Sequence, residues 1–203
     1  MRPGDRSAAG FGVGVAARLA SIAARLLAGA LLVAGTAAAS DEAGWALVQP
    51  GTVVMFRHAL APGVGDPAAF KIDDCSTQRN LDEAGRAQAV RIGEQFRHRG
   101  IAVGAVLSSQ WCRARDTATL AFPGQVRDDS TLNSVFRASE RSAAQTAAVR
   151  ATVAAWRGPG VLVLVTHQVN ISALTGTPTA SGEGVVLRAA PGGGIEVLGR
   201  VQP

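Results

Sequence analysis

The stretch VLVLVT at residues 161–166 limits the possible folds more than any other part of the chain, because it contains no charged residue. Successive side chains of a β-strand point to opposite faces, so a strand that is apolar throughout is buried on both faces. Helices that cover both sides of a mostly parallel sheet provide such burial. We therefore place residues 160–167 at the centre of a parallel sheet.

Other strands and helices alternate along the chain. Apolar, β-branched runs predict strands over 51–56 and 101–109. Between them, apolar residues spaced by about 3.6 positions predict a helix over 80–100, with Asn80 as its N-cap and Glu83 at the capping-box position. We also expect helices over 113–122 and 140–158, an irregular segment over 125–139, and a terminal strand pair over 183–190 and 193–202.

This order predicts an α/β fold with a mostly parallel central sheet and helices on both faces. The chain has 203 residues, which suits one domain, over residues 40–203. The connection over 59–79 has about 20 residues and is longer than most, and such loops are often functional.

The first 39 residues predict a secretory signal peptide. Four arginines precede an uncharged run over 26–39, and small residues then supply a cleavage site near Ala39 or Ser40. The run is short for a membrane span, which needs about 20 residues. We expect a periplasmic or secreted protein that meets the membrane only through this segment before cleavage. An anchor that stays uncleaved is the alternative.

The charge of the chain does not favour nucleic-acid binding. The 20 Lys and Arg residues exceed the 15 Asp and Glu residues, for a net charge of +5. Residues 1–39 hold four Arg and one Asp, so residues 40–203 keep 16 basic and 14 acidic residues. No basic run or aromatic stacking platform is present, and we therefore expect no nucleic-acid partner.

Polar residues follow three of the predicted strands where each one ends: Arg57-His58, Ser108-Ser109 and Thr166-His167. Ligands of such sheets bind beyond the carboxyl ends of the strands, and Arg113 begins the helix after the second strand. Two arginines and two histidines make an anion pocket that suits phosphate. A neutral imidazole can attack phosphorus while the cations stabilise its oxygens, so no metal or cofactor is required.

The pieces FRHA at 56–59, SSQWCRARDTA at 108–118 and VTH at 165–167 resemble, in this order, the motifs of the histidine phosphatase superfamily. The segment DCSTQRNLDEAGRAQA also looks like a feature of that family. The resemblance implies a three-layer sandwich like that of phosphoglycerate mutase, with His58 as the nucleophile. It implies that Arg57, Arg113 and His167 bind the phosphoryl group, and Ser108 and Ser109 are then expected to cap the next helix.

The chain departs from the family pattern in two places. Many members have Gly after the nucleophile, where this chain has Ala59, and neither usual general acid is present. Segment 125–139 contains no Glu, and Gln168 follows His167. A leaving alkoxide needs a proton, so Glu183 is our first candidate for the acid, with Asp73 and Asp74 second. Some small family members that act on protein phosphohistidine lack an acid, because their leaving group is good.

These residues predict an exported phosphomonoesterase that acts on a small-molecule or glycan phosphate through a phosphohistidine on His58. A weak or inactive module that binds phospho-ligands is the alternative, and an anchored envelope protein with an incidental pocket is a third. In an oxidising compartment the two cysteines, Cys75 and Cys112, are candidates for a disulfide. Two unrelated thiols are the other possibility.

Overall fold

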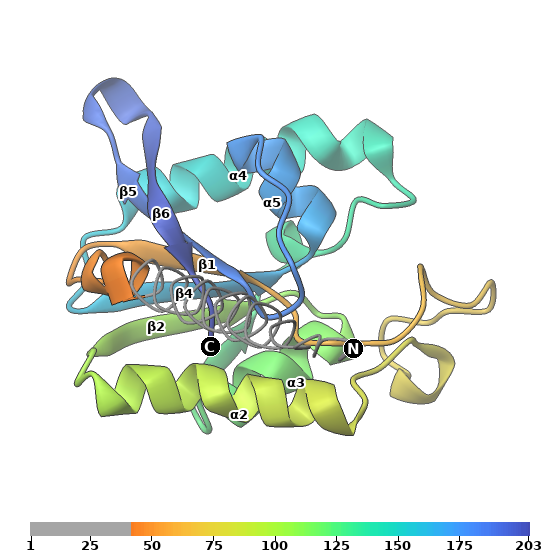
Figure 1. Cartoon of the computed structure of the whole chain (residues 1–203). Helices are drawn as coiled ribbons and strands as arrows, with labels where there is room; N and C mark the ends of the chain where they lie inside the picture. Colours follow the sequence, from red (N-terminus) through yellow and green to blue (C-terminus); the bar gives the residue numbers. More distant parts are fainter. Residues whose placement is uncertain (1–41) are drawn as a thin grey trace, which may run out of the picture. The chain divides into compact units, whose positions relative to one another are not determined.

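The computed structural model describes residues 42–203, so the predicted signal peptide and cleavage site lie outside the described residues. Six strands form one sheet in the order β3-β2-β4-β1-β5-β6, and it is flanked by helices above and below (Figure 1). β1 to β4 are parallel, and β5 and β6 extend the sheet as antiparallel strands. The strands are β1 (Val53–Arg57), β2 (Val103–Ser108), β3 (Val126–Asp128), β4 (Val161–Thr166), β5 (Gly184–Ala189) and β6 (Ile195–Val201).

The sheet has a helical layer on each face, which confirms the predicted α/β fold. α2 (Glu83–His98) and α3 (Cys112–Ala121) lie on one face, and α4 (Ser142–Ala155) and α5 (Gln168–Thr175) lie on the other (Figure 1). Alternate residues of β4 belong to two separate hydrophobic clusters, since Val163 packs with α2 and α3 while Leu164 packs with α4 and α5. Every residue of β4 is buried, as its composition predicts.

Two local predictions were wrong, and one helix was missed. Asp82, not Asn80, caps α2 by accepting a hydrogen bond from the Gly85 N–H at 2.7 Å. The Asn80 amide instead donates to the Cys75 carbonyl at 2.6 Å, and this hydrogen bond closes the preceding loop. Segment 125–139 is only partly irregular, since it contains β3 and the 3-10 turn η2 (Ser130–Leu132). α5 was not predicted, because eight residues without a side-chain cap give little periodic signal.

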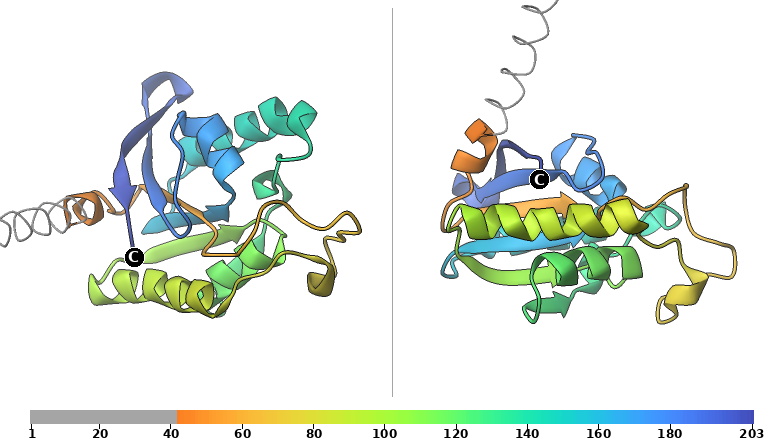
Figure 2. Two further views of the ribbon diagram at one scale, coloured as in Figure 1. Left: turned by 45° about the vertical axis from the view of Figure 1, so that its right-hand side comes forward. Right: turned by 60° about the horizontal axis from the view of Figure 1, so that its bottom comes forward.

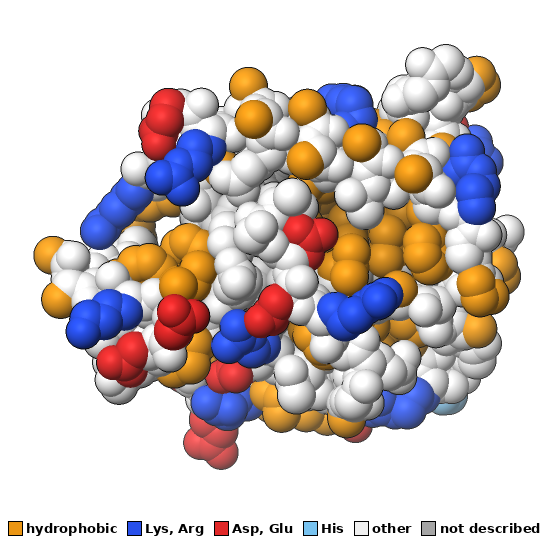
Figure 3. Space-filling view, turned by 180° about the vertical axis from the view of Figure 1, so that it is seen from behind, with side chains coloured by type: hydrophobic (Ala, Val, Ile, Leu, Met, Phe, Trp, Pro, Cys, Tyr) orange, Lys and Arg blue, Asp and Glu red, His pale blue; other side chains and the backbone are white. Residues whose placement is uncertain are grey.

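The long connection after β1 projects beyond the carboxyl edge of the sheet in both views of Figure 2. It contains the 3-10 turn η1 (Cys75–Thr77), and two further turns are η3 (Ser139–Arg141) and η4 (Pro191–Gly193). Seen from behind, hydrophobic side chains gather in hollows of the surface, and basic side chains alternate with acidic ones (Figure 3). Within residues 42–203, no helix has the length and apolar character needed to span a membrane.

Candidate active site

The ends of β1, β2 and β4 meet at one edge of the sheet, because these strands are parallel and adjacent. This arrangement brings His58 and His167 together, with ring centroids 5.4 Å apart. Both imidazoles are buried. The strands therefore assemble the two histidines that the sequence predicts for the site.

The hydrogen bonds of His58 determine which of its ring nitrogens is unprotonated. Nδ1 lies 2.7 Å from the Ala59 carbonyl, which can only accept, so Nδ1 carries the proton. Nε2 accepts a hydrogen bond from Arg113 Nε at 3.2 Å. Burial, with the charges of Arg113, Arg79 and Arg57, lowers the pKa of His58 to about 3, although the Ala59 hydrogen bond opposes this shift. His58 is thus a neutral imidazole with an unprotonated Nε2.

The loop after His58 is fixed by side chains of both helices on that face. The Ala59 N–H donates to Thr117 Oγ1 of α3 at 2.9 Å, and the Leu60 N–H donates to Gln88 Oε1 of α2 at 3.0 Å. Gly85 permits the close approach of Leu60 to α2, because a Cβ at position 85 would lie 1.9 Å from the Leu60 carbonyl oxygen. No described non-glycine residue has a positive φ, so the backbone accommodates Ala59 in place of the family's glycine without strain.

His167 is held by Ser109, which directly follows β2. Its Nε2 lies 2.9 Å from the Ser109 hydroxyl, which is also 3.2 Å from Asn133 Oδ1. Burial lowers the pKa of His167 well below its ordinary value, and the neighbouring His58 and arginines lower it further. The expected capping role of Ser108 and Ser109 was wrong, because Trp111 is the N-cap of α3 and Ser109 orients the second histidine instead.

Three arginines surround the histidines: Arg57, Arg79 and Arg113. Arg57 Nη1 donates to the Thr179 carbonyl at 2.8 Å, while its buried Nε has no hydrogen-bond partner. Burial lowers the pKa of each of the three guanidinium groups, and the charge of Arg113 adds to this effect for the other two. Arginine nevertheless keeps its charge in proteins, so this edge of the sheet is strongly cationic.

Arg79 was missed in the sequence, although it stands in the segment that resembles the family. Its Nε donates to the Gly65 carbonyl at 2.8 Å, and Nη1 donates to the Ala61 carbonyl. Both acceptors belong to the long loop after β1, which has no periodic pattern that could predict its path. The only available signal was the family-like segment around Arg79.

Asp66 was missed too, and it makes the most contacts of any acidic side chain at this edge. Its carboxylate forms two hydrogen bonds with Arg113, at 2.7 and 3.2 Å, and accepts a third from Trp111 Nε1 at 3.0 Å. Burial raises the pKa of Asp66, but the hydrogen bonds and charge of Arg113, together with the hydrogen bonds from the Arg79 N–H and Trp111, outweigh burial and lower it. Asp66 is therefore an ionised partner of the guanidinium that faces His58.

A cavity of about 190 Å³ lies among these groups. This volume is below the range of about 300–1,000 Å³ that is typical of pockets for drug-sized molecules, so the cavity suits a group the size of phosphate. Its lining includes Arg57, His58, Arg79, Arg113 and His167, together with Asp66, Ser134, Phe136 and Gln168. We call it the phosphoryl cavity.

Glu183 is buried at the same edge of the sheet but does not line this cavity. One carboxylate oxygen accepts a hydrogen bond from the Ala180 N–H at 2.6 Å, and the other pairs with Arg200 Nε at 2.7 Å. The negative charge of Glu183 also partly offsets the lowering of the Arg57 pKa. These contacts hold the carboxylate away from the phosphoryl cavity, and its role as the acid stays a prediction.

Neither second candidate lines the phosphoryl cavity either. Asp74 accepts a hydrogen bond from the Ser76 N–H at 3.0 Å and caps η1, while Asp73 is exposed. In residues 42–203 there is no group of three or more His, Cys, Asp or Glu side chains arranged to hold a metal ion.

A disulfide joins Cys75 to Cys112, with the two Cα atoms 5.7 Å apart. It connects η1 in the long loop to the first residue of α3, next to Arg113. A bridge across 37 residues contributes about 4 kcal/mol in the chain-entropy model of disulfide stabilisation. The disulfide therefore anchors the loop that supplies Asp66 and Arg79.

The chain matches solved structures with a similar fold over nearly the whole length of those structures. The tungstate complex of the protein histidine phosphatase SixA has a TM-score of 0.54 at 16% identity, covering 75% of this chain and 97% of SixA. The product of open reading frame Rv3214 from Mycobacterium tuberculosis has a TM-score of 0.55 at 14% identity, covering 74% and 97%. A mutant phosphoserine phosphatase from Entamoeba histolytica, bound to phosphoserine, has a TM-score of 0.50 at 11% identity, covering 73% and 95%. No protein-family model and no curated protein sequence matches the chain.

Proposed function

We propose that this chain, which has the fold of the histidine phosphatase superfamily, is a phosphomonoesterase that forms a phosphohistidine on His58. One observation carries the proposal. His58 Nε2 is unprotonated, borders the phosphoryl cavity and lies 3.2 Å from Arg113 Nε. A nucleophile beside a cluster of cations is the arrangement that phosphoryl transfer requires.

In the first step, the lone pair of His58 Nε2 forms a bond to phosphorus while the bond to the ester oxygen breaks. That oxygen leaves with the electron pair and takes up a proton. In the second step, water gives up a proton to the group that protonated the leaving oxygen and attacks phosphorus. The N–P bond breaks, phosphate is released, and His58 regains its lone pair. Arg57, Arg79, Arg113 and His167 stabilise the phosphoryl oxygens in both steps, because charge spreads over those oxygens in the transition state.

Asp66 is better placed than Glu183 to donate the proton, since it lines the phosphoryl cavity. A phosphoryl group that binds Arg113 takes over the hydrogen bonds that Asp66 makes in the free protein. Asp66 then loses its cationic partner and lies beside a dianion, and both changes raise its pKa. Substrate binding thereby converts an ionised carboxylate into a proton donor.

We infer that the protein acts in the periplasm or outside the cell, after cleavage of residues 1–39, on a small-molecule or glycan phosphate. The disulfide supports this compartment, because disulfides persist in oxidising environments. The alternative function is a phospho-ligand-binding module with little turnover. It is favoured by the ion pair of Asp66 with Arg113, which must open before phosphate can bind.

The first experiment measures hydrolysis of an activated aryl phosphate by residues 40–203 without added metal. We expect activity in the wild type and its loss in His58→Ala. The exposed His98 at the end of α2 supplies the matched control, His98→Ala, which keeps full activity. A folded wild-type protein that binds vanadate without any hydrolysis would favour the binding module.

A second experiment locates the acid by comparing good and poor leaving groups. Asp66→Asn slows the hydrolysis of alkyl phosphates by a factor of about 100 and leaves activated aryl phosphates much less affected, because only the alkoxide needs a proton. Glu183→Gln changes both substrates equally. The opposite pattern would return the role of acid to Glu183.

A further inference from the structure

A second cavity, of about 480 Å³, adjoins the phosphoryl cavity. Both cavities are lined by Asp66, Ser134 and Phe136, so a ligand can extend from one into the other. The second cavity has room for a drug-sized group, whereas the first does not. We call it the side cavity.

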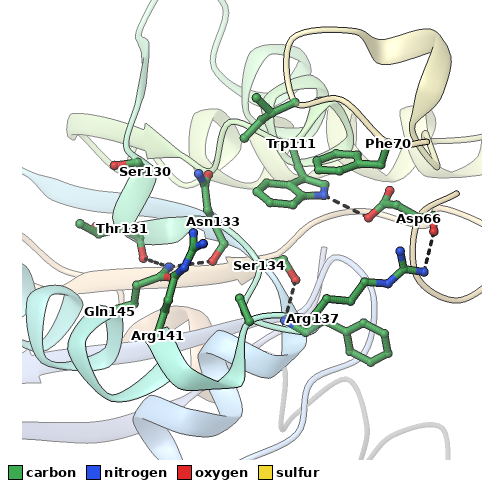
Figure 4. Close-up of a pocket in the computed structure, with 13 residues that line it drawn as sticks. Asp66, Phe70, Trp111, Ser130, Thr131, Asn133, Ser134, Arg137, Arg141 and Gln145 are labelled. Atoms are coloured by element: carbon green, nitrogen blue, oxygen red, sulfur yellow. Dashed lines mark hydrogen bonds between the residues drawn. The ribbon is translucent and has the colours of Figure 1, made fainter. Parts of the chain in front are cut away.

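One wall of the side cavity is aromatic and held in place. The rings of Phe70 and Trp111 stack with centroids 4.9 Å apart and an interplanar angle of 17° (Figure 4). The Trp111 indole N–H donates to Asp66 at 3.0 Å, and the rings of Trp111 and His167 lie in a T-shaped arrangement with centroids 5.5 Å apart. The wall is thus fixed before any ligand arrives, which reduces the entropy lost on binding.

Three polar side chains of the lining donate hydrogen bonds within the protein, two of them to backbone carbonyls. Gln145 Nε2 donates to the carbonyls of Thr131 and Asn133, at 3.2 and 2.9 Å. The Asn133 amide donates to Gln110 Oε1 at 2.9 Å, and Arg137 donates to the Asp66 carbonyl at 2.8 Å. These hydrogen bonds occupy Gln145 and Asn133, so Phe70, Trp111 and Phe136 offer a ligand apolar contact, while Arg137 and Arg141 add cationic groups to the lining.

Two hydrophobic side chains that line these cavities remain exposed. Phe136, which lines both cavities, is 56% exposed, and Val64 beside the phosphoryl cavity is 90% exposed. An exposed apolar patch at the mouth of a site marks a ligand-binding surface. A ligand in the side cavity would cover the Phe136 ring.

From these contacts we infer that the substrate is a phosphate monoester of a bulky, flat, apolar alcohol or phenol, whose leaving group occupies the side cavity. The inference rests on the proposed function of the phosphoryl cavity. A phosphorylated serine or histidine side chain is too small to fill the side cavity by itself. The chemistry of the site therefore favours a small aromatic or polycyclic phosphate over a phosphoprotein.

Two non-hydrolysable ligands that differ by one aromatic ring test the inference by calorimetry: benzylphosphonate and 2-naphthylmethylphosphonate. We expect the naphthyl ligand to bind the wild type about tenfold more tightly, because the extra ring is buried. In Phe136→Ala and in Phe70→Ala this preference falls below about threefold. The control, Val197→Ala, removes an exposed hydrophobic side chain of β6 and keeps the preference.

Equal affinity of the wild type for the two ligands would overturn the inference, as would a preference that both Phe variants retain. Hydrolysis of phenyl and 2-naphthyl phosphate, whose leaving groups have similar acidity, separates the inference from the proposed function. Turnover of both esters at the same kcat/KM refutes the side-cavity inference alone. Preferential binding of the naphthyl phosphonate without turnover of either ester refutes the phosphatase and leaves the side cavity as a ligand site.

Discussion

Replacement of Asp66 by Asn is expected to have two opposite effects, on stability and on anion affinity. Asp66 and Arg113 form a nearly buried ion pair, with side chains that are 12% and 3% exposed. The variant keeps the shape of the side chain and the hydrogen bonds that its carbonyl oxygen can accept. It removes the negative charge that compensates a buried guanidinium.

The stability effect follows from the cost of an uncompensated buried charge. Removal of one partner of such a pair costs about 3 kcal/mol or more. An amide that still accepts a hydrogen bond recovers part of this, so we expect the free energy of unfolding to fall by about 2–3 kcal/mol in phosphate-free buffer. Chemical denaturation of wild type and variant measures this difference.

The affinity effect has the opposite sign, because Asp66 competes with phosphate for Arg113. Without the competing carboxylate, we expect vanadate and inorganic phosphate to bind at least about tenfold more tightly, which corresponds to about 1.4 kcal/mol. Bound phosphate should then raise the Tm of the variant more than that of the wild type, since ligand binding to the native state stabilises it.

Calorimetric titration with vanadate measures the affinity, and thermal unfolding with and without phosphate measures the linked stabilisation. Asp73→Asn is the matched control, because Asp73 is an exposed residue of the same loop. Unchanged or weaker vanadate binding in Asp66→Asn would refute the view that Asp66 occupies the phosphate-binding face of Arg113.

Three further perturbations have defined outcomes. Arg79→Ala should weaken vanadate binding by a factor of about 10 or more, because a charged hydrogen bond is lost. The control Arg86→Ala, at an exposed position of α2, should leave vanadate binding unchanged. Equal effects of the two variants would exclude Arg79 from the site. Double replacement of Cys75 and Cys112 by Ala should lower the free energy of unfolding by about 3–4 kcal/mol in denaturant titrations, and an unchanged midpoint would refute a stabilising bridge. The pKa of His58 is lowered from 6.5 to about 3. Between these two pH values the unfolded state therefore binds a proton on His58 that the native state does not bind. His58 should therefore contribute a fall in stability of about 1.4 kcal/mol per pH unit as pH drops below 6.5. His167, whose pKa is also lowered, contributes in the same direction, so His58→Gln should make the slope shallower by about 1.4 kcal/mol per pH unit without abolishing it. Equal slopes in the two proteins would contradict the lowered pKa of His58.

Much of the fold could be predicted, because it depends on local patterns of apolar residues. The six residues of β4 are buried on both faces, and their composition shows it directly. The convergence of Arg57-His58, Ser108-Ser109 and Thr166-His167 could be predicted as well, since the ends of neighbouring parallel strands must lie at one edge. The four matched residues of the family motifs accordingly meet at one cavity.

The remaining features depend on contacts between distant segments. Asp66 reaches Arg113 across 47 residues through a loop with no periodic pattern. The position of Glu183 between His167 and β5 makes it a candidate for the general acid, yet its carboxylate pairs with Arg200 of β6. The stacking of Phe70 on Trp111 likewise joins two segments whose separate sequences give no sign of a shared cavity.

The most direct test of phosphohistidine chemistry is to trap the intermediate. The protein is mixed with an activated aryl phosphate, quenched in alkali to preserve phosphohistidine, and digested for peptide mass spectrometry. We predict one phosphoryl group on the peptide that contains His58, absent from His58→Ala and removed by acid. Burst release of the phenol with phosphate on no histidine, or on His167 in place of His58, would contradict the account.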